Sequence, residues 1–239
     1  MDKKAIIIGA TSGIGKALAE ALASEGYVLG LTGRREALLT ELKDQLPCQV
    51  FVQVMDVADT RAAQAQFEDV LNAMGGTDLV IINAGIGHPN PELDPALELE
   101  TIDTNVSGFV GIATAAYTHF RECGSGHLVG LSSIAALRGT AMGPAYGASK
   151  AFISNYMEGL RLRALKEKLK ITVTDVQPGF VDTAMAKGEG LFWVAPPKKA
   201  AAQILCAVKA RKSQIYITKR WRLIAWLLKI LPERVLAKI

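Results

Sequence analysis

A tyrosine and a lysine stand four positions apart in the segment AYGASK, residues 145–150. At helical spacing, Tyr146 and Lys150 lie on one face of a helix. An ammonium group there favours the phenolate and lowers the pKa of a tyrosine, which is ordinarily about 10 and too high for proton transfer near neutrality. The pair predicts a tyrosine acid–base catalyst. Taken alone, its commoner interpretation is a solvated helix surface.

Two polar residues upstream strengthen the catalytic interpretation. Ser133 closes an apolar, strand-like run thirteen residues before Tyr146. Its hydroxyl could hold a substrate oxygen as negative charge develops, or it could simply end the strand. Asn105 falls within a mostly apolar helical pattern. A buried asparagine needs hydrogen-bond partners, so Asn105 is either a structural bridge or part of a polar proton relay.

A glycine-rich turn, GATSGIG, joins the first strand-like run to an amphipathic helical pattern. Gly9, Gly13 and Gly15 permit a tight turn and a close backbone approach, and the helix N-terminus offers free N–H groups to a pyrophosphate. The spacing is G-x-x-x-G-x-G, unlike the common G-x-G-x-x-G. Because a strand precedes it and a helix follows it, we interpret it as a dinucleotide-binding turn rather than a purely structural one.

The end of the second strand-like run indicates which dinucleotide is bound. NAD-binding domains usually place an acid about 20 residues beyond the glycines, on the ribose 2′-hydroxyl. Gly33 stands there instead, followed by Arg34 and Arg35. An arginine can hold a 2′-phosphate and no carboxylate repels it, so we predict NADP(H). The alternative is two arginines that begin a solvated helix. Asp56, after the third strand, is either an adenine contact or a turn residue.

The elements that would position these residues alternate along the chain. The strand candidates lie at 4–10, 27–33, 49–55, 78–85, 126–133, 170–179 and 214–218. Helical patterns lie near 13–25, 35–46, 60–74, 95–122, 146–168 and 197–210. Nearly continuous Val, Ile and Leu suits strands buried on both faces of a parallel sheet. We therefore predict a single α/β domain with a doubly wound parallel sheet, whose ligands bind at the carboxyl ends of the strands.

With these motifs in order, residues 4–218 resemble the short-chain dehydrogenase/reductase family. GATSGIG is similar to its glycine motif, NAG at 83–85 to its strand-stabilising motif, and PGFVDT at 178–183 to its nicotinamide-contacting segment. The resemblance implies a catalytic set of Asn105, Ser133, Tyr146 and Lys150. The cofactor-binding residues that it implies are Gly9, Thr11, Ser12, Gly13, Ile14, Gly15, Arg34, Arg35, Asp56, Val57, Asn83, Ala84, Gly85, Tyr146, Lys150, Pro178, Gly179, Val181 and Thr183.

The same resemblance carries expectations about architecture and assembly. It implies a Rossmann-type fold with seven parallel strands and helices on both faces. It also implies a homodimer or homotetramer, packed through helices near 103–122 and 146–168. One position departs from the family pattern: Ile8 stands where the family usually has threonine before the first glycine. We expect a local adjustment there rather than loss of cofactor binding.

Composition excludes several other classes of protein. The three cysteines among 239 residues are widely separated, so we expect neither a disulfide framework nor a metal site, and we expect a cytoplasmic protein. Residues 211–239 carry eight Lys or Arg and one acid, a net charge of +7, which leaves −3 for residues 1–210. A mildly acidic main domain argues against nucleic-acid binding.

The basic tail, residues 219–239, is predicted to be an amphipathic helix appended to the domain formed by residues 1–218. Its apolar stripe is Leu223, Ile224, Leu227, Leu228 and Leu231, whereas Arg222, Ala225 and Lys229 fall on another face. The stretch is too short and too charged to span a bilayer. It fits either an interfacial helix, peripheral to the inner face of a membrane, or a helix docked on protein.

These features predict an NADP(H)-dependent oxidoreductase that interconverts a carbonyl and an alcohol on a small molecule. Gly188 and Gly190 beside Phe192 and Trp193 predict a mobile substrate lid with an apolar face, and hence an apolar substrate. Two alternatives remain. One is a non-catalytic NADP(H)-binding regulator on the same fold, and the other is a membrane-associated scaffold in which the tail is the functional part.

Overall fold

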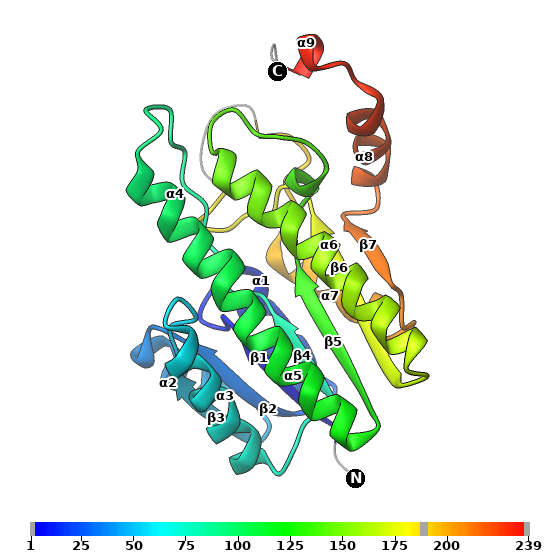
Figure 1. Ribbon diagram of the computed structural model, residues 1–239. Helices are drawn as coiled ribbons and strands as arrows, with labels where there is room; N and C mark the ends of the chain where they lie inside the picture. Colours follow the sequence, from blue (N-terminus) through cyan, green and yellow to red (C-terminus); the bar gives the residue numbers. More distant parts are fainter. Residues whose placement is uncertain (1–2, 187–190, 237–239) are drawn as a thin grey trace.

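Seven parallel strands form the centre of the fold in the computed structural model, which describes residues 3–186 and 191–236 (Figure 1). The strands are β1 (Lys4–Ile8), β2 (Val28–Gly33), β3 (Val50–Val54), β4 (Leu79–Ile82), β5 (Ser125–Leu131), β6 (Lys170–Pro178) and β7 (Gln214–Ile217). Their order in the sheet is β3-β2-β1-β4-β5-β6-β7. The predicted seven-stranded, doubly wound parallel sheet is confirmed.

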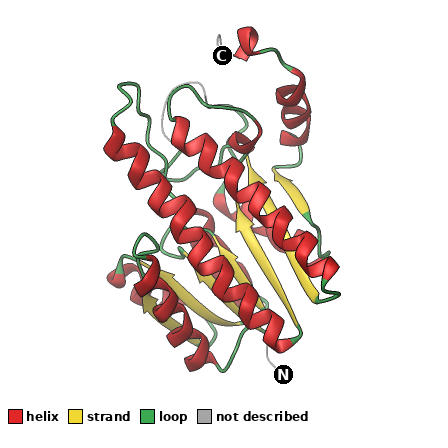
Figure 2. Cartoon of the chain, in the orientation of Figure 1, coloured by secondary structure: helices red, strands yellow, loops and turns green. Residues whose placement is uncertain are grey.

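Helices cover both faces of this sheet (Figure 2). One face carries α1 (Gly13–Ser24), α2 (Glu36–Gln45) and α7 (Pro197–Lys209), and the other carries α3 (Thr60–Met74), α5 (Phe109–Cys123) and α6 (Pro144–Lys166). A hydrophobic core lies on each face of the sheet. Within β1, Ala5 and Ile7 belong to the core under α1, α2 and α7, whereas Ile6 and Ile8 belong to the core under α3, α5 and α6. Since alternate side chains enter separate cores, the strand is apolar throughout.

The strand order reverses direction at β1, which lies between β2 and β4. Ligand-binding crevices form at such a switch point, outside the carboxyl ends of the strands. There the backbone N–H of Ala10 donates to Thr32 (2.8 Å), and the N–H of Asn83 donates to Ile8 (2.9 Å). The segments that follow β1, β2 and β4 are thereby held together at one edge of the sheet.

One predicted helix is interrupted. The pattern at 95–122 becomes α4 (Pro95–Ile102), a π-helical turn over residues 103–108, and then α5. Asn105 lies in the turn and bonds to the backbone of Ile86, while Gly108 packs against the carbonyl of Val57. These contacts join the turn to residues far away in the chain, so the pattern of hydrophobic residues within 95–122 does not reveal the interruption.

The C-terminal segment is divided into two helices in its described part, whereas a single helix was predicted. It contains α8 (Trp221–Ile230) and α9 (Glu233–Leu236), and residues 237–239 lie outside the described part. Leu231 takes an extended conformation because Pro232 follows it. Ala225 is buried against the domain, whereas Leu223 and Leu227 of the predicted stripe are exposed. Among the described helices, none is long and apolar enough to cross a membrane.

Candidate active site

The helix α6 brings Tyr146 and Lys150 to the carboxyl edge of the sheet within its first two turns. Pro144 occupies the first helical position, where its fixed φ suits a helix start. The next backbone N–H, that of Ala145, donates to Glu98 Oε2 (2.7 Å). A carboxylate at a helix N-terminus satisfies a free donor and complements the helix dipole. Sequence reasoning missed Glu98, because its partner lies 47 positions away.

We predict that Glu98→Ala lowers the free energy of unfolding by about 0.5–2 kcal/mol, the usual range for a lost helix cap. Turnover should fall as well, because the cap fixes the helix that presents Tyr146. Denaturant unfolding and steady-state kinetics measure the two effects. The matched control is Glu158→Ala, an exposed glutamate on α6 itself. If both substitutions have equal effects, the capping role is wrong.

Lys150 is buried, and its Nζ donates to the backbone oxygen of Leu131 (3.1 Å). Burial lowers the lysine pKa to about 8, and the nearby carboxylate of Asp175 opposes that change. Lys150 Nζ lies 5.8 Å from the centre of the Tyr146 ring. The lysine therefore faces the tyrosine from the protein interior, as their helical spacing predicts.

The pKa of Tyr146 is raised in the folded protein, opposite to the prediction that Lys150 lowers it. Burial raises the pKa of Tyr146, and the opposing influence comes from the side chain of Ser133. The ring packs closely on Gly87, where an added Cβ would lie 2.6 Å from Tyr146 Cδ2. Lys150 is not among the groups that shift the pKa of Tyr146; its own ammonium group is desolvated and donates to the carbonyl of Leu131.

The two serines after β5 have separate roles. Ser132 points into the protein, where its Oγ donates to Asp175 Oδ1 (2.5 Å). Ser133 is the N-cap of a short 3₁₀ helix, residues 134–137, and its Oγ accepts the Ala135 N–H (3.1 Å). Of these two serines, Ser133 is the one whose side chain lowers the pKa of Tyr146. The structure thus places Ser133, and not its neighbour, beside the phenol.

Asn105 is fully buried and joins the π-helical turn to two neighbouring segments. Its Oδ1 accepts the Ile86 N–H (2.8 Å), and its Nδ2 donates to the Ile86 carbonyl (2.7 Å) and to Ser149 Oγ (3.0 Å). An added Cβ at Gly85 would meet both Asn105 Oδ1 (3.1 Å) and Lys150 Nζ (3.2 Å). Asn105 therefore forms the structural bridge, at a position next to Lys150.

A buried carboxylate behind the site was not anticipated. Asp175, in the middle of β6, is 1% exposed. Its two oxygens accept hydrogen bonds from side chains of four residues, namely Ser132, Ser154, Gln177 and Gln214. A carboxyl group whose two oxygens only accept hydrogen bonds fits the ionised form, which has no proton to donate. The available signal was an acid in the middle of a predicted strand, since a buried charge needs partners.

The glycine turn has the geometry that a dinucleotide requires. Gly9 and Gly13 have φ values of +87° and +56°, and a Cβ at Gly9 would lie 2.8 Å from the Ala84 backbone. A Cβ at Gly15 would collide with the Gly9 carbonyl, which already accepts Asn83 Nδ2 (2.7 Å). The first turn of α1 carries no acidic residue, and Ser12 makes no side-chain cap bond. The helix N-terminus is thus available to a phosphate, and these residues fit the cofactor.

The arginines after β2 lie beside this turn. Arg35 Nη2 donates to Thr11 Oγ1 (2.6 Å) and Ser12 Oγ (2.9 Å). Arg34 Nη1 lies 3.9 Å from Asp56 Oδ2, and both side chains are exposed. The other Asp56 oxygen accepts the Ala58 N–H (3.1 Å), which is the turn role predicted as one alternative. Two cations therefore face solvent at the edge where a ribose phosphate would be bound.

The segment after β6 closes the other side of the crevice. A Cβ at Gly13 would lie 2.9 Å from Thr183 Cγ2, so the glycine turn and Thr183 are close neighbours. Val181 is held by a bridge to Ala195. Pro178 is the last residue of β6, and the indole of Trp221 packs directly on Gly179, where any Cβ would clash. The remaining predicted cofactor residues, Ile14 and Val57, lie at the start of α1 and after β3.

An aromatic cluster covers this segment, and sequence reasoning found only part of it. Phe192 stacks on Trp221 with ring centres 5.1 Å apart, and Phe180 meets Trp221 edge-on at 5.3 Å. Trp193 lies 6.1 Å from Trp221. The predicted lid glycines, Gly188 and Gly190, lie outside the described residues. The tail thus contributes Trp221 to the same wall as the predicted lid.

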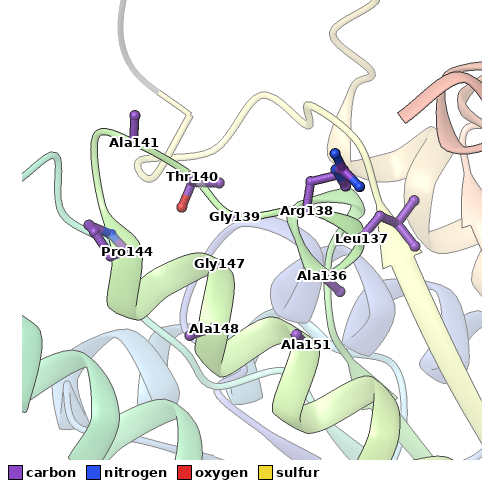
Figure 3. Close-up of a pocket in the computed structure, with 10 residues that line it drawn as sticks. All are labelled: Ala136, Leu137, Arg138, Gly139, Thr140, Ala141, Pro144, Gly147, Ala148 and Ala151. Atoms are coloured by element: carbon purple, nitrogen blue, oxygen red, sulfur yellow. The ribbon is translucent and has the colours of Figure 1, made fainter. Parts of the chain in front are cut away.

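A hollow of about 550 Å³ lies beside α6 (Figure 3). It is lined by the 136–141 loop and by small residues on α6, among them Gly147, Ala148 and Ala151. None of Asn105, Ser133, Tyr146 and Lys150 lines it. Ser133 instead follows β5, Tyr146 and Lys150 lie in the first two turns of α6, and Asn105 lies in the π-helical turn.

Comparison with known proteins agrees with this geometry. Residues 3–191 match the family described as short chain dehydrogenase. The chain is 36% identical over 189 residues to sulfoacetaldehyde reductase 2 of Chromohalobacter salexigens, covering 77% of this chain and 74% of that protein. It is 32% identical over 243 residues to an uncharacterized oxidoreductase of Mycobacterium tuberculosis, covering 97% and 95%. The mycobacterial match therefore extends into the residues after 218.

Proposed function

Because the chain belongs to the short-chain dehydrogenase/reductase family, whose members use NAD(P)(H), we propose that it interconverts a carbonyl and an alcohol on an apolar small molecule. The observation that carries the proposal is the arrangement of Tyr146. Its ring lies against Gly87, Ser133 interacts with its hydroxyl, and Lys150 faces it from the interior. A phenol between a hydroxyl donor and a buried cation is suited to exchanging one proton with a substrate oxygen.

Each side chain has a defined part in this reaction. A nicotinamide cofactor, when bound, would supply or accept the hydride. In the reducing direction, Tyr146 donates its proton to the carbonyl oxygen, and Ser133 stabilises the charge that develops on that oxygen. Cationic Lys150 favours the phenolate that remains. In the oxidising direction, the phenolate accepts the proton of the alcohol.

NADP(H) is the cofactor that the edge after β2 supports. Within the described residues, that position carries Gly33, Arg34 and Arg35 and no acid that would receive a ribose 2′-hydroxyl. Guanidinium groups recognise phosphate through paired hydrogen bonds. Arg35 is already bonded to Thr11 and Ser12, whereas among the described residues Arg34 has only the long contact to Asp56. Arg34 is therefore the residue that turns to the 2′-phosphate.

We expect Arg34→Ala to raise the Michaelis constant for NADPH by roughly tenfold or more, because a charge-assisted contact is lost, and to leave that for NADH nearly unchanged. Steady-state kinetics with both cofactors measures this. Arg61→Ala, an exposed arginine on α3, is the control for a change in overall charge. Equal Michaelis constants for NADPH and NADH in the unmodified protein would contradict the assignment.

The substrate wall supports an apolar carbonyl compound. Phe180, Phe192 and Trp221 form one aromatic surface over the segment that follows β6. Aromatic surfaces of this kind favour apolar ligands with few polar groups. The similarity to a protein named sulfoacetaldehyde reductase supports aldehyde reduction as one direction of the reaction.

The function is tested by NADPH oxidation over a panel of aldehydes, ketones, quinones and acyl-chain carbonyls of graded length, with sulfoacetaldehyde included. We expect kcat/KM to rise with apolar chain length. If the protein binds NADPH but turns over no carbonyl in the panel and no corresponding alcohol, the non-catalytic regulator is the better interpretation. The highest rate with the smallest, most polar substrate would overturn the apolar assignment.

A further inference from the structure

The helix α8 carries an apolar face that nothing in the described part of the chain covers. Leu223 and Trp226 are 70% and 65% exposed, and Leu227 and Ile230 are also exposed. Their spacing places these four side chains on one side of the helix. The opposite side carries Trp221 and Ala225, each 2% exposed. A helix that only docks on its own domain turns a polar side outward, and α8 does not.

Contacts with the main domain fix the orientation of this face. The Trp221 indole packs on Gly179 and stacks on Phe192. At the other end, Arg138 Nη2 donates to the carbonyl of Leu231 (2.8 Å). Both ends of α8 are thus held against the main domain, and its exposed side chains lie on the side away from that domain. The apolar face is therefore a surface of the folded protein.

Charge indicates what this surface meets. Lys219, Arg220, Arg222 and Lys229 are all exposed, and no acid occurs between residues 218 and 232. A helix whose apolar side includes tryptophan and is flanked only by cations suits the surface of an anionic membrane. Its apolar side chains would contact hydrocarbon, and its cations would contact anionic headgroups. A symmetric contact between two copies of α8 would instead bring two sets of cations together, which is unfavourable.

We propose that α8 lies in the interface of an anionic bilayer, with Leu223, Trp226, Leu227 and Ile230 in the headgroup–acyl boundary and the four cations on phospholipid headgroups. The helix lies at the same edge as the carboxyl ends of the strands (Figure 1). Binding would therefore turn the substrate crevice toward the membrane. This inference is independent of the proposed reaction, because it rests only on α8 and its contacts.

The test uses the full-length protein and vesicle flotation. The vesicles are phosphatidylcholine alone, or phosphatidylcholine mixed with phosphatidylglycerol. We expect binding to the anionic vesicles only, weakened by added salt. The double variant Leu223→Gln/Trp226→Gln should bind at least about tenfold more weakly, since it removes most of the inserting surface. Truncation after residue 218 is a poorer test, because it uncovers Gly179 and Phe192 as well.

A matched control separates this face from apolar exposure in general. Leu162 and Leu165 on α6 have the same spacing and are 60% and 69% exposed. Leu162→Gln/Leu165→Gln should bind vesicles like the unmodified protein, and both double variants should keep their NADPH binding. Failure of the unmodified protein to bind anionic vesicles would overturn the proposal. So would equal loss in the two double variants. Loss of oligomeric mass in the α8 variant, without vesicle binding, would assign the face to a second copy.

Discussion

Tyr146→Phe should reduce kcat by about 10²–10⁴-fold, the range that a positioned general acid contributes. The substitution removes one oxygen and keeps the ring that packs on Gly87. The fold and the glycine turn are therefore unaffected, and NADPH should bind with nearly unchanged affinity. Steady-state kinetics in the reducing direction measures the loss, and NADPH fluorescence titration measures the binding.

A second tyrosine on the same helix gives the control. Tyr156 lies on α6, where it stacks on Phe152 at 5.6 Å and takes no part in the crevice. Tyr156→Phe should leave kcat within about twofold of the unmodified protein, because surface and aromatic contacts survive the change. Near-normal turnover in Tyr146→Phe would contradict both the catalytic assignment and the proposed proton transfer.

Asp175→Asn should shift the pH dependence of the enzyme. The Asp175 carboxylate supports the charge on Lys150, whose pKa burial has lowered to about 8. Without that carboxylate, the pKa of Lys150 falls further. In the reducing direction, kcat/KM should decline as pH rises through the lysine pKa. The decline should therefore begin at lower pH in the variant than in the unmodified protein.

Stability gives an independent measurement of the same coupling. Lys150 binds its proton less tightly in the folded state than in the unfolded state, where its pKa is near 10.5. The unfolded chain therefore holds more protons between pH 8 and 10.5, and this group makes the protein more stable as pH rises through that window. In Asp175→Asn the window should extend to lower pH. Denaturant unfolding at a series of pH values measures it.

Ser154→Ala is the matched control for this variant. It removes one hydrogen bond to Asp175 Oδ2 (2.6 Å) but keeps the carboxylate charge. We expect it to cost about 0.5–1.5 kcal/mol of stability and to leave the pH profile in place. If Asp175→Asn has the same pH profile as the unmodified protein, Asp175 does not act through Lys150, and its network is structural only.

Local signals in the sequence were sufficient for the fold and for the positions of the main site residues. β1 reads as a continuous apolar run because its two faces enter two cores. The glycine turn could be identified because Gly9 and Gly13 adopt positive φ, which other residues rarely do. Tyr146 and Lys150 needed only helical spacing. Each of these features depends on a residue and its near neighbours in the chain.

Features that depend on distant partners were not predictable in this way. The interruption of the 95–122 helix follows from bonds between Asn105 and Ile86. Glu98 matters because it accepts a hydrogen bond from the start of α6. Ser132 is distinguished from Ser133 by its contact with Asp175. Neither periodicity nor composition records which residues meet across the sheet.

In the C-terminal tail, too, some features follow from the sequence and others depend on tertiary packing. Its basic charge, its tryptophans and its amphipathic pattern are properties of the sequence alone. Which of its sides is buried was decided by tertiary packing, because Gly179 leaves room for the Trp221 indole and so turns Ala225 inward. That rotation directs Leu223 and Trp226 to solvent. The sequence by itself determined the sheet, the cofactor turn and the Tyr146–Lys150 pair, since these arise from local backbone and side-chain preferences. The tertiary structure alone decided the pKa environment of that pair and the exposed face of α8, since both depend on burial by residues far away in the chain.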